Sequence, residues 1–210
     1  MPYLELQNIS LGFKDQTLFE DLNLSINKGE KLVISGPSGI GKSSLLKLIL
    51  GFIPEFKGQI KFNDETISTQ NIWKLRRSIG YISQDSDIGE GKVSQLIEDI
   101  FALKANIKQK PKESRITKLL HDFRLDESTL NKDFEELSGG EKKRVVIIIS
   151  ILLDRDFFFL DEITAGLDAE AQETVIDYFI QSTHTAIIIS HDKEWLNRNG
   201  VKEFRLKSNK

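Results

Sequence analysis

Cysteine is absent from the 210 residues of this chain, which excludes disulfide bonds and cysteine-ligated zinc or iron–sulfur centres. Long hydrophobic runs are also missing. The most apolar stretch, Val145–Leu153, is interrupted by Ser150 and is far shorter than the roughly 20 residues that span a bilayer. Residues Met1–Gln7 lack the basic start and the apolar stretch of a signal peptide. We therefore expect this protein to act at a membrane only through a partner.

An excess of basic residues is missing as well. The chain has 29 Lys and Arg against 32 Asp and Glu, a net charge of −3, so we expect no nucleic-acid partner. Hydrophobic residues make up 39% of the chain and charged residues 29%, which is typical of a globular protein. We expect a single domain over residues 1–210, long enough to carry an inserted lobe.

Two kinds of strand are predicted. Polar and apolar residues alternate over Tyr3–Ile9, and similar runs follow at Leu22–Ile26 and Gln59–Phe62, which indicates half-buried antiparallel strands. Short, continuous apolar runs indicate parallel strands buried on both faces, and a helical pattern follows each of them. These runs are Lys31–Ser35, Phe157–Leu160 and Ala186–Ser190. The predicted fold is therefore α/β, with a mainly parallel sheet and an N-terminal antiparallel part.

A helical lobe is predicted within the α/β core. Apolar residues recur at helical spacing over Val93–Leu103 and Ile116–Phe123, amid many Lys and Glu. The pattern suggests a helical subdomain inserted at about residues 87–143.

A phosphate-binding loop follows the first buried strand. Its residues match G-x-x-x-x-G-K-[ST], and a helical stretch from Ser44 comes next. Glycines let the backbone turn its N–H groups toward phosphate oxygens, and the helix N-terminus favours the same anion. Lys42 is expected to reach the β- and γ-phosphates, and the Ser43 hydroxyl to bind Mg²⁺. The alternative is a glycine-rich turn that fits the pattern by chance. The loop comprises Gly36, Pro37, Ser38, Gly39, Ile40, Gly41, Lys42 and Ser43.

Two acids end the second buried strand. Asp161 and Glu162 follow Phe157–Leu160, at the edge where parallel strands present side chains to a ligand crevice. We expect Asp161 to hold Mg²⁺, and Glu162 to orient or deprotonate the attacking water. The alternative is a solvated strand end.

The run Leu137–Glu141, LSGGE, carries a family resemblance. Ser138 and Glu141 form an S-x-x-E capping box at the start of an apolar helix, which is a purely structural interpretation. The same run resembles the signature of ABC (ATP-binding cassette) ATPases. The resemblance implies that Ser138, Gly139 and Gly140 bind the γ-phosphate of an ATP held by a second subunit. Both interpretations can hold together, because a helix start with exposed N–H groups is also an anion site.

Further residues match the family's pattern in order. Phe13 resembles the aromatic that stacks on adenine, although a plain core aromatic is the alternative. Gln84 resembles the glutamine that touches Mg²⁺ and water, and Asp168, in Ala165–Asp168, resembles a residue that joins the two subunits. His191 resembles the histidine that contacts the γ-phosphate. A polar loop residue and a structural histidine are the alternatives for Gln84 and His191. His121 and His184 match nothing in the family.

The resemblance covers Phe13 to His191, with modest departures. Ile163 stands where the family often has proline, and Gly166 where alanine is frequent. The stretch Asn131–Glu136 lacks the glycines that many fused exporters carry before the signature. A finer resemblance, in Leu160–Thr164 and Ser190–Glu194, is to small bacterial ATP-binding subunits proposed to serve the export of metals such as iron.

The resemblance implies an ATPase with ATP and Mg²⁺ as ligands. It further implies a head-to-tail dimer, in which the chain pairs with itself or with a relative, and a separately encoded integral membrane permease. The permease would dock around Gln84–Lys92 and the helix Val93–Leu103, which places the chain on the cytoplasmic face of the membrane. Two alternatives remain: a soluble ABC ATPase of repair, translation or assembly, and a silent ATP-binding scaffold. Glu162, Lys42 and His191 are all present, which argues against the scaffold.

Overall fold

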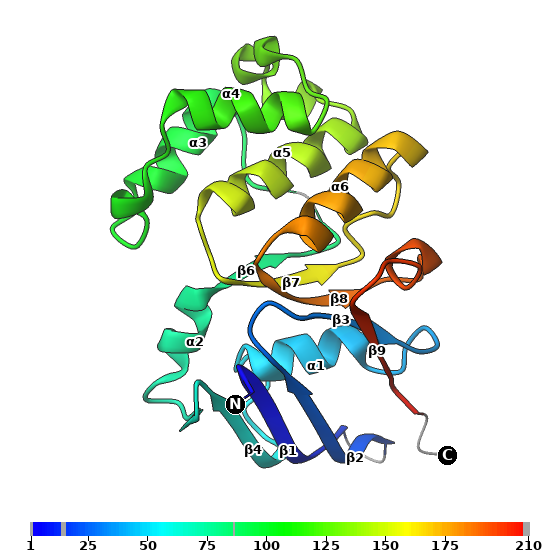
Figure 1. Cartoon of the computed structure of the whole chain (residues 1–210). Helices are drawn as coiled ribbons and strands as arrows, with labels where there is room; N and C mark the ends of the chain where they lie inside the picture. Colours follow the sequence, from blue (N-terminus) through cyan, green and yellow to red (C-terminus); the bar gives the residue numbers. More distant parts are fainter. Residues whose placement is uncertain (1, 14–15, 86, 208–210) are drawn as a thin grey trace.

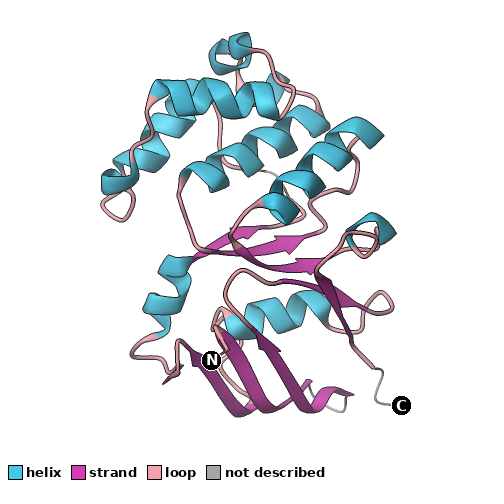
Figure 2. Ribbon diagram, in the orientation of Figure 1, coloured by secondary structure: helices cyan, strands magenta, loops and turns pink. Residues whose placement is uncertain are grey.

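The computed structural model of the chain describes residues 2–13, 16–85 and 87–207, without the side chains of Phe13 and Gln16. Figure 1 shows stacked layers: an antiparallel sheet with α1 above it, a parallel sheet, the helices α5 and α6, and then α3 and α4. The same layers are coloured by type in Figure 2.

The parallel sheet has the order β6-β7-β8-β3-β9 within the described residues. Three of its strands lie where apolar runs predicted them: β3 (Lys31–Ser35), β7 (Phe157–Asp161) and β8 (Thr185–Ile189). Two strands were not predicted, β6 (Ile79–Ile82) and β9 (Val201–Arg205). All neighbouring strands run parallel. The predicted α/β class is confirmed.

The antiparallel sheet has the order β2-β1-β4-β5. Its strands are β1 (Leu4–Phe13), β2 (Gln16–Ile26), β4 (Lys57–Phe62) and β5 (Glu65–Thr66), so the first two are longer than the alternation suggested. Bulges interrupt the pairing of β1 with both neighbours. At Gly58, where φ is 101°, an added Cβ would lie 2.4 Å from the carbonyl oxygen of Asn8, so this crossing requires glycine.

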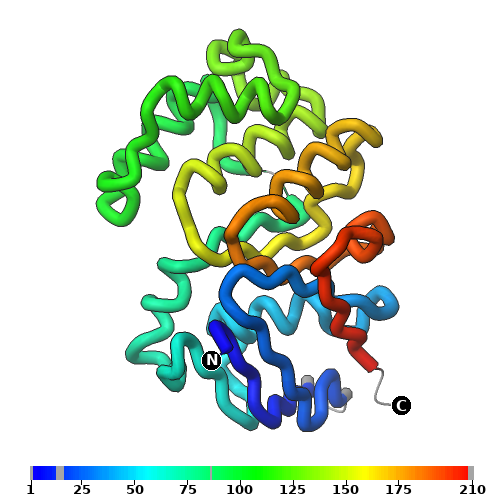
Figure 3. The backbone as a smooth tube through the Cα atoms, in the orientation of Figure 1, coloured from blue at the N-terminus to red at the C-terminus, as the bar shows by residue number. Residues whose placement is uncertain are grey.

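The helices are α1 (Lys42–Ile49), α2 (Ile72–Ser78), α3 (Val93–Ala102), α4 (Glu113–Asp122), α5 (Gly139–Leu152) and α6 (Ala169–Gln181). Short 3-10 turns lie at Ile107–Gln109, Glu127–Asn131, Phe134–Glu136 and Lys193–Trp195. The tube in Figure 3 follows the chain from β6 out through α3 and α4 and back along α5 to β7.

Strand β7 divides the hydrophobic core in two. Its side chains alternate between sheet faces, so Phe157 and Phe159 pack with α1 and the antiparallel sheet, while Phe158 and Leu160 pack with α5 and α6. All four are fully buried. This burial fixes the carboxyl end of β7, where the two predicted acids lie. Within the described residues, no helix has the length and hydropathy needed to cross a membrane.

Candidate functional site

The glycine-rich loop lies between the end of β3 at Ser35 and the start of α1 at Lys42. Gly39 and Gly41 have φ values of 77° and 102°, which disfavour other residues. A Cβ on Gly41 would also come within 3.0 Å of the Phe19 ring. The loop therefore bends tightly and delivers the N-terminal end of α1 to the cleft, where no acidic residue occupies the first turn.

Lys42 lies folded back over this loop. Its Nζ donates hydrogen bonds to the carbonyl oxygens of Gly36, at 2.9 Å, and Pro37, at 3.1 Å. The side chain is largely buried, and these two carbonyl oxygens hold the ammonium over the loop. Ser43 and Ser44 follow it in the first turn of α1 and place two hydroxyls at the same end of the helix.

The two acids at the end of β7 both reach the cleft because the backbone turns sharply there. Asp161 is the last residue of β7, and Glu162 has a φ of 53°, a left-handed conformation that is uncommon for a residue with a side chain. The Glu162 N–H donates to the carbonyl of Ile189 at 2.9 Å. Strain of this kind is kept where the surroundings enforce it, and it is concentrated at functional sites.

Glu162 faces His191 across the ends of β7 and β8. The His191 Nε2 lies 3.5 Å from Oε1 of Glu162, and the imidazole is exposed while the carboxylate is mostly covered. A protonated His191 would form an ion pair with Glu162, and a neutral one could donate a hydrogen bond after a small approach.

A cleft of about 610 Å³ brings most of the predicted residues together. It opens at the carboxyl ends of the parallel strands, as expected for a ligand crevice in a sheet of this kind. Its lining consists of Ser38, Gly39, Gly41, Lys42, Ser43, Ser44, Gln84, Asp161, Glu162, Ala165, Ile189 and His191. Among the described residues, the predicted loop residues Gly36, Pro37 and Ile40 are not part of this lining, and neither are Ser138, Gly139, Gly140 and Asp168. The side chain of Phe13 lies outside the described part of the chain.

The signature residues cap α5. The Glu141 N–H donates to Oγ of Ser138 at 3.3 Å, and the Ser138 N–H donates to a carboxylate oxygen of Glu141 at 2.9 Å. These hydrogen bonds hold the pKa of Glu141 below its ordinary value. The capping box is thus present, and Gly139 and Gly140 place further N–H groups at the start of the helix. Gly139 lines an adjoining groove of about 650 Å³, next to Lys142 and Gly166, which shares Gln84 and Ala165 with the cleft.

The Asp168 side chain caps the N-terminus of α6. Its carboxylate accepts a hydrogen bond from the Ala171 N–H at 2.8 Å, and this bond lowers the pKa of the exposed Asp168 carboxyl. The residue is thus fixed at the surface, beside the loop that follows Glu162.

Tyr81 is a neighbour of the cleft that sequence reasoning missed. Its hydroxyl lies 3.5 Å from Oδ2 of Asp161, and burial together with the Asp161 charge raises the pKa of Tyr81. The phenol therefore stays protonated and faces the carboxylate from β6. Only the prediction of β6 as a strand beside β7 could have suggested this pairing.

Lys143 is a second missed residue. It lies on the core face of α5, and its Nζ donates to the carbonyl of Ala165 at 2.6 Å and approaches that of Glu162 at 3.4 Å. Burial lowers the pKa of Lys143, an effect that the nearby Glu162 charge opposes. The sequence did indicate that Lys143 lies on the buried face of the helix. It precedes the apolar Val146 and Ile147 by three and four residues, which is the spacing of one helix face.

We expect Lys143→Met to slow ATP turnover by roughly 10- to 100-fold while leaving ATP affinity unchanged. The substitution removes the donor that holds the turn after Glu162, and misplaced catalytic groups lose rate rather than binding. Lys143→Gln, which keeps a donor, should recover much of the rate. Steady-state kinetics with a separate nucleotide-binding assay would measure both. Equal loss in the Met and Gln variants, or unchanged turnover in both, would contradict this role.

The fold and the cleft define a P-loop nucleotide hydrolase. Comparison with known proteins is more specific: residues 19–165 match the family described as ABC transporter. The chain belongs to this family, as the ATP-binding subunit that hydrolyses ATP to energise a membrane permease.

Several relatives resemble the chain along nearly its whole length. The ergothioneine transport ATP-binding protein EgtV of Helicobacter pylori is 33% identical over 97% of this chain and 96% of its own. The probable iron export ATP-binding protein FetA of Escherichia coli is 32% identical over 93% and 88%. The structure of cbiO1 from Clostridium perfringens, part of the transporter complex cbiONQ, superposes with a TM-score of 0.80. Its identity is 28%, covering 98% of this chain and 85% of that one.

Proposed function

We propose that two copies of this chain bind two ATP molecules head to tail, on the cytoplasmic face of the membrane beside their permease. One observation carries the proposal: a single chain holds a phosphate cradle with its acids in one cleft, while the signature serine and glycines lie outside the lining of that cleft. Each cleft would be completed by Ser138, Gly139 and Gly140 of the other copy. The N–H groups at the start of α5 suit the γ-phosphate.

The cleft residues divide the chemistry among them. Lys42 would leave the two loop carbonyls and bind the β- and γ-phosphates. Glu162 would accept a proton from the attacking water or orient it, as a general base must. His191, close to Glu162, would contact the γ-phosphate, and Gln84 would contact the water. Asp168, at the surface next to this loop, would contact the second copy.

The donor set fits Mg²⁺ held jointly with the nucleotide. Within the described residues there is no group of three or more His, Asp or Glu side chains that would form an all-protein metal site. The cleft instead offers one hydroxyl, one amide and one strand-end carboxylate, on Ser43, Gln84 and Asp161. Mg²⁺ commonly takes its remaining ligands from phosphates and water, and when bound it neutralises charge on the phosphate oxygens.

The groove beside Gln84 supports docking of the permease. Asp85, Asp87, Glu90 and Glu135 line this groove together with Lys142 and Lys143, so acids outnumber cations there by four to two. Cytoplasmic loops of membrane proteins carry an excess of Lys and Arg, so the charges are complementary. The cargo is a property of the permease. Relatives of nearly equal identity are named for ergothioneine transport and for iron export, so their names select no substrate for this chain.

The experiment is affinity purification of the tagged chain from detergent-solubilised native membranes, followed by mass spectrometry. We expect a multi-span membrane protein in near-equal amount. The double variant Asp85→Lys/Glu90→Lys should reduce its recovery at least tenfold, because like charges then face each other. The control Glu20→Lys/Glu55→Lys reverses two exposed acids away from the groove. Recovery of soluble partners alone would favour a non-transport ABC ATPase, and equal recovery with both variants would refute this docking site.

A further inference from the structure

The connection between α3 and α4, residues 103–112, differs from the rest of the chain in its charge. We call it the basic tip. It contains Lys104, Lys108, Lys110 and Lys112 and no Asp or Glu, in a protein whose net charge is −3. It also exposes two large apolar side chains, Leu103 at 58% and Ile107 at 60%. Figure 1 shows this segment at the left end of the helical layer, away from the strand ends that carry the cleft.

The basic tip has a defined shape. The N–H groups of Asn106 and Ile107 both donate to the carbonyl of Leu103, at 2.8 and 3.1 Å, so a hydrogen-bonded turn joins the two exposed apolar residues. The buried Asn106 anchors the turn, because its amide donates to the Ile100 carbonyl at 3.0 Å and accepts a hydrogen bond from Arg155 at 2.7 Å. The exposed apolar pair is therefore held outward by the fold.

Cations continue from the basic tip onto α4. Lys108, Lys110 and Lys112 line a shallow hollow of about 560 Å³ together with Arg115 and Lys118 of the helix. The acid in the same lining, Asp154, pairs with Arg115 at 3.1 Å, and both side chains are partly exposed. Lys118 likewise pairs with Asp122 at 2.7 Å, so Lys108, Lys110 and Lys112 supply the excess positive charge of the hollow.

We propose that the basic tip rests on anionic phospholipid head groups next to the permease. This inference builds on the proposed function, because the tip begins at Leu103, where the helix expected to face the permease ends. The inner leaflet of a membrane is negatively charged and attracts clustered Lys. Leu103 and Ile107 would enter the boundary between head groups and acyl chains.

The basic tip and the proposed permease site carry charge of opposite sign. Cytoplasmic permease loops are rich in Lys and Arg, so they suit the acidic groove and would be repelled by the basic tip. The molecule therefore presents an acidic surface for its protein partner and a basic surface for the lipid beside that partner.

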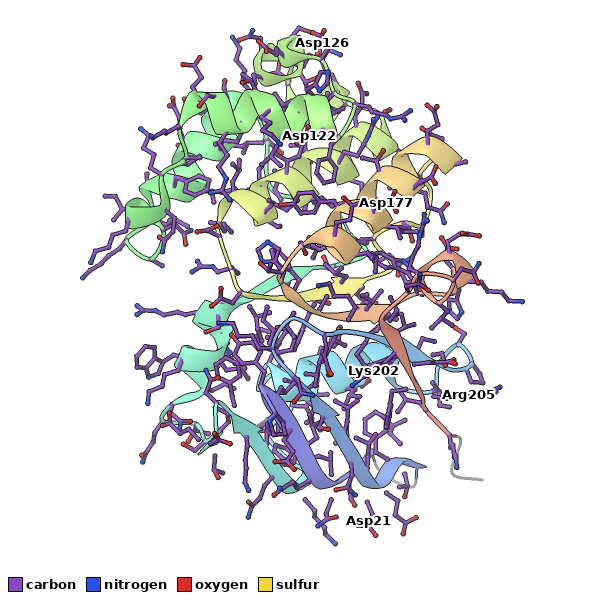
Figure 4. The ribbon with its side chains drawn as sticks, in the orientation of Figure 1. Asp21, Asp122, Asp126, Asp177, Lys202 and Arg205 are labelled. Atoms are coloured by element: carbon purple, nitrogen blue, oxygen red, sulfur yellow. The ribbon has the colours of Figure 1, made fainter. Side chains whose placement is uncertain are left out.

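Vesicle flotation with the purified chain tests the proposal. We expect binding to vesicles of phosphatidylcholine with 30% phosphatidylglycerol, weaker binding at high salt, and none to phosphatidylcholine alone. Neutralising Lys104, Lys108, Lys110 and Lys112 to Gln should weaken partitioning by roughly 10²–10³-fold, at about fivefold for each residue. Leu103→Ser/Ile107→Ser should weaken it with the salt dependence retained. The control neutralises four exposed cations elsewhere to Gln: Lys28, Lys57, Arg205 and Lys207, of which Figure 4 labels Arg205 at the opposite side of the molecule.

Failure to bind the anionic vesicles, or equal binding by the tip variant and the control, would overturn the proposal. Reduced recovery of the permease with the tip variant, with vesicle binding unchanged, would assign the tip to a protein partner instead. All variants should keep the basal ATPase rate, because the substituted residues lie outside the cleft. A chain that floats with vesicles but recovers no membrane protein would contradict the proposed function and leave lipid binding intact.

Discussion

Glu162→Gln is expected to slow ATP hydrolysis by about 10²–10⁴-fold and to leave ATP binding intact. The substitution preserves the size of the side chain and its position beside His191, but an amide cannot accept the proton of the attacking water. The carboxylate is well placed for this role, because the left-handed turn at Glu162 directs it into the cleft that also contains Lys42. Single-turnover kinetics would measure the rate.

The same variant should accumulate as a dimer in the presence of ATP. In the proposed dimer, two chains would hold the γ-phosphate from both sides and separate after it is cleaved, so blocked hydrolysis should retain the closed form. Analytical ultracentrifugation with and without ATP would detect this change. Glu203→Gln is a suitable control, since this carboxylate accepts a hydrogen bond from the Ser35 hydroxyl at 2.5 Å at the base of the loop and lies outside the cleft lining. Normal hydrolysis by Glu162→Gln would show that another group is the base.

The parts of the site that sequence alone predicted are those in which chemistry and local structure need the same residues. The glycines of residues 36–41 are required by backbone conformation and by the approach of a phosphate, so the pattern is rarely accidental. Apolar runs predicted β3, β7 and β8 because a strand buried on both faces is apolar at nearly every position. Strand β9 escaped prediction because it is a partly exposed edge, and β6 because it has only four residues.

The missed residues depend on distant contacts. Lys143 holds the turn after Glu162, from a helix that begins 23 residues before that turn. Nothing in the local sequence states which carbonyls a helix lysine will reach once α5 packs on the sheet. Glu162 has a φ of 53° and a hydrogen bond to Ile189 on the neighbouring strand. Strict strand alternation would have placed the two acids on opposite faces, so the expectation that both reach one cleft depended on their position at the strand end.

The signature shows why one motif can have two correct interpretations. Ser138 accepts the Glu141 N–H as an ordinary helix cap, and this use consumes only an acceptor position of its hydroxyl. The first N–H groups of α5, on Gly139 and Gly140, remain for an anion. The stabilising cap therefore presents the proposed phosphate contact, and the two roles do not compete.

Lys42→Ala is expected to weaken ATP binding by about 10²–10³-fold, because charge-assisted hydrogen bonds to phosphate oxygens contribute about 1.5–3 kcal/mol each. The carbonyl oxygens of Gly36 and Pro37 already hold the Lys42 ammonium over the loop that would bind the phosphates. Isothermal titration with a non-hydrolysable ATP analogue would measure the loss apart from turnover.

Lys31 provides the matched control for this prediction. It is also a buried lysine, and its Nζ donates to the carbonyls of Gly29, Ser182 and His184, at 3.0, 2.8 and 2.6 Å. Lys31→Ala should therefore lower the free energy of unfolding, since three carbonyls lose their donor, while ATP affinity stays unchanged. The two lysines differ in what they face: Lys31 serves the fold alone, whereas Lys42 can exchange its loop carbonyls for phosphates. Equal loss of ATP affinity in both variants would mean that Lys42 acts through stability, and its role in the cleft would have to be abandoned.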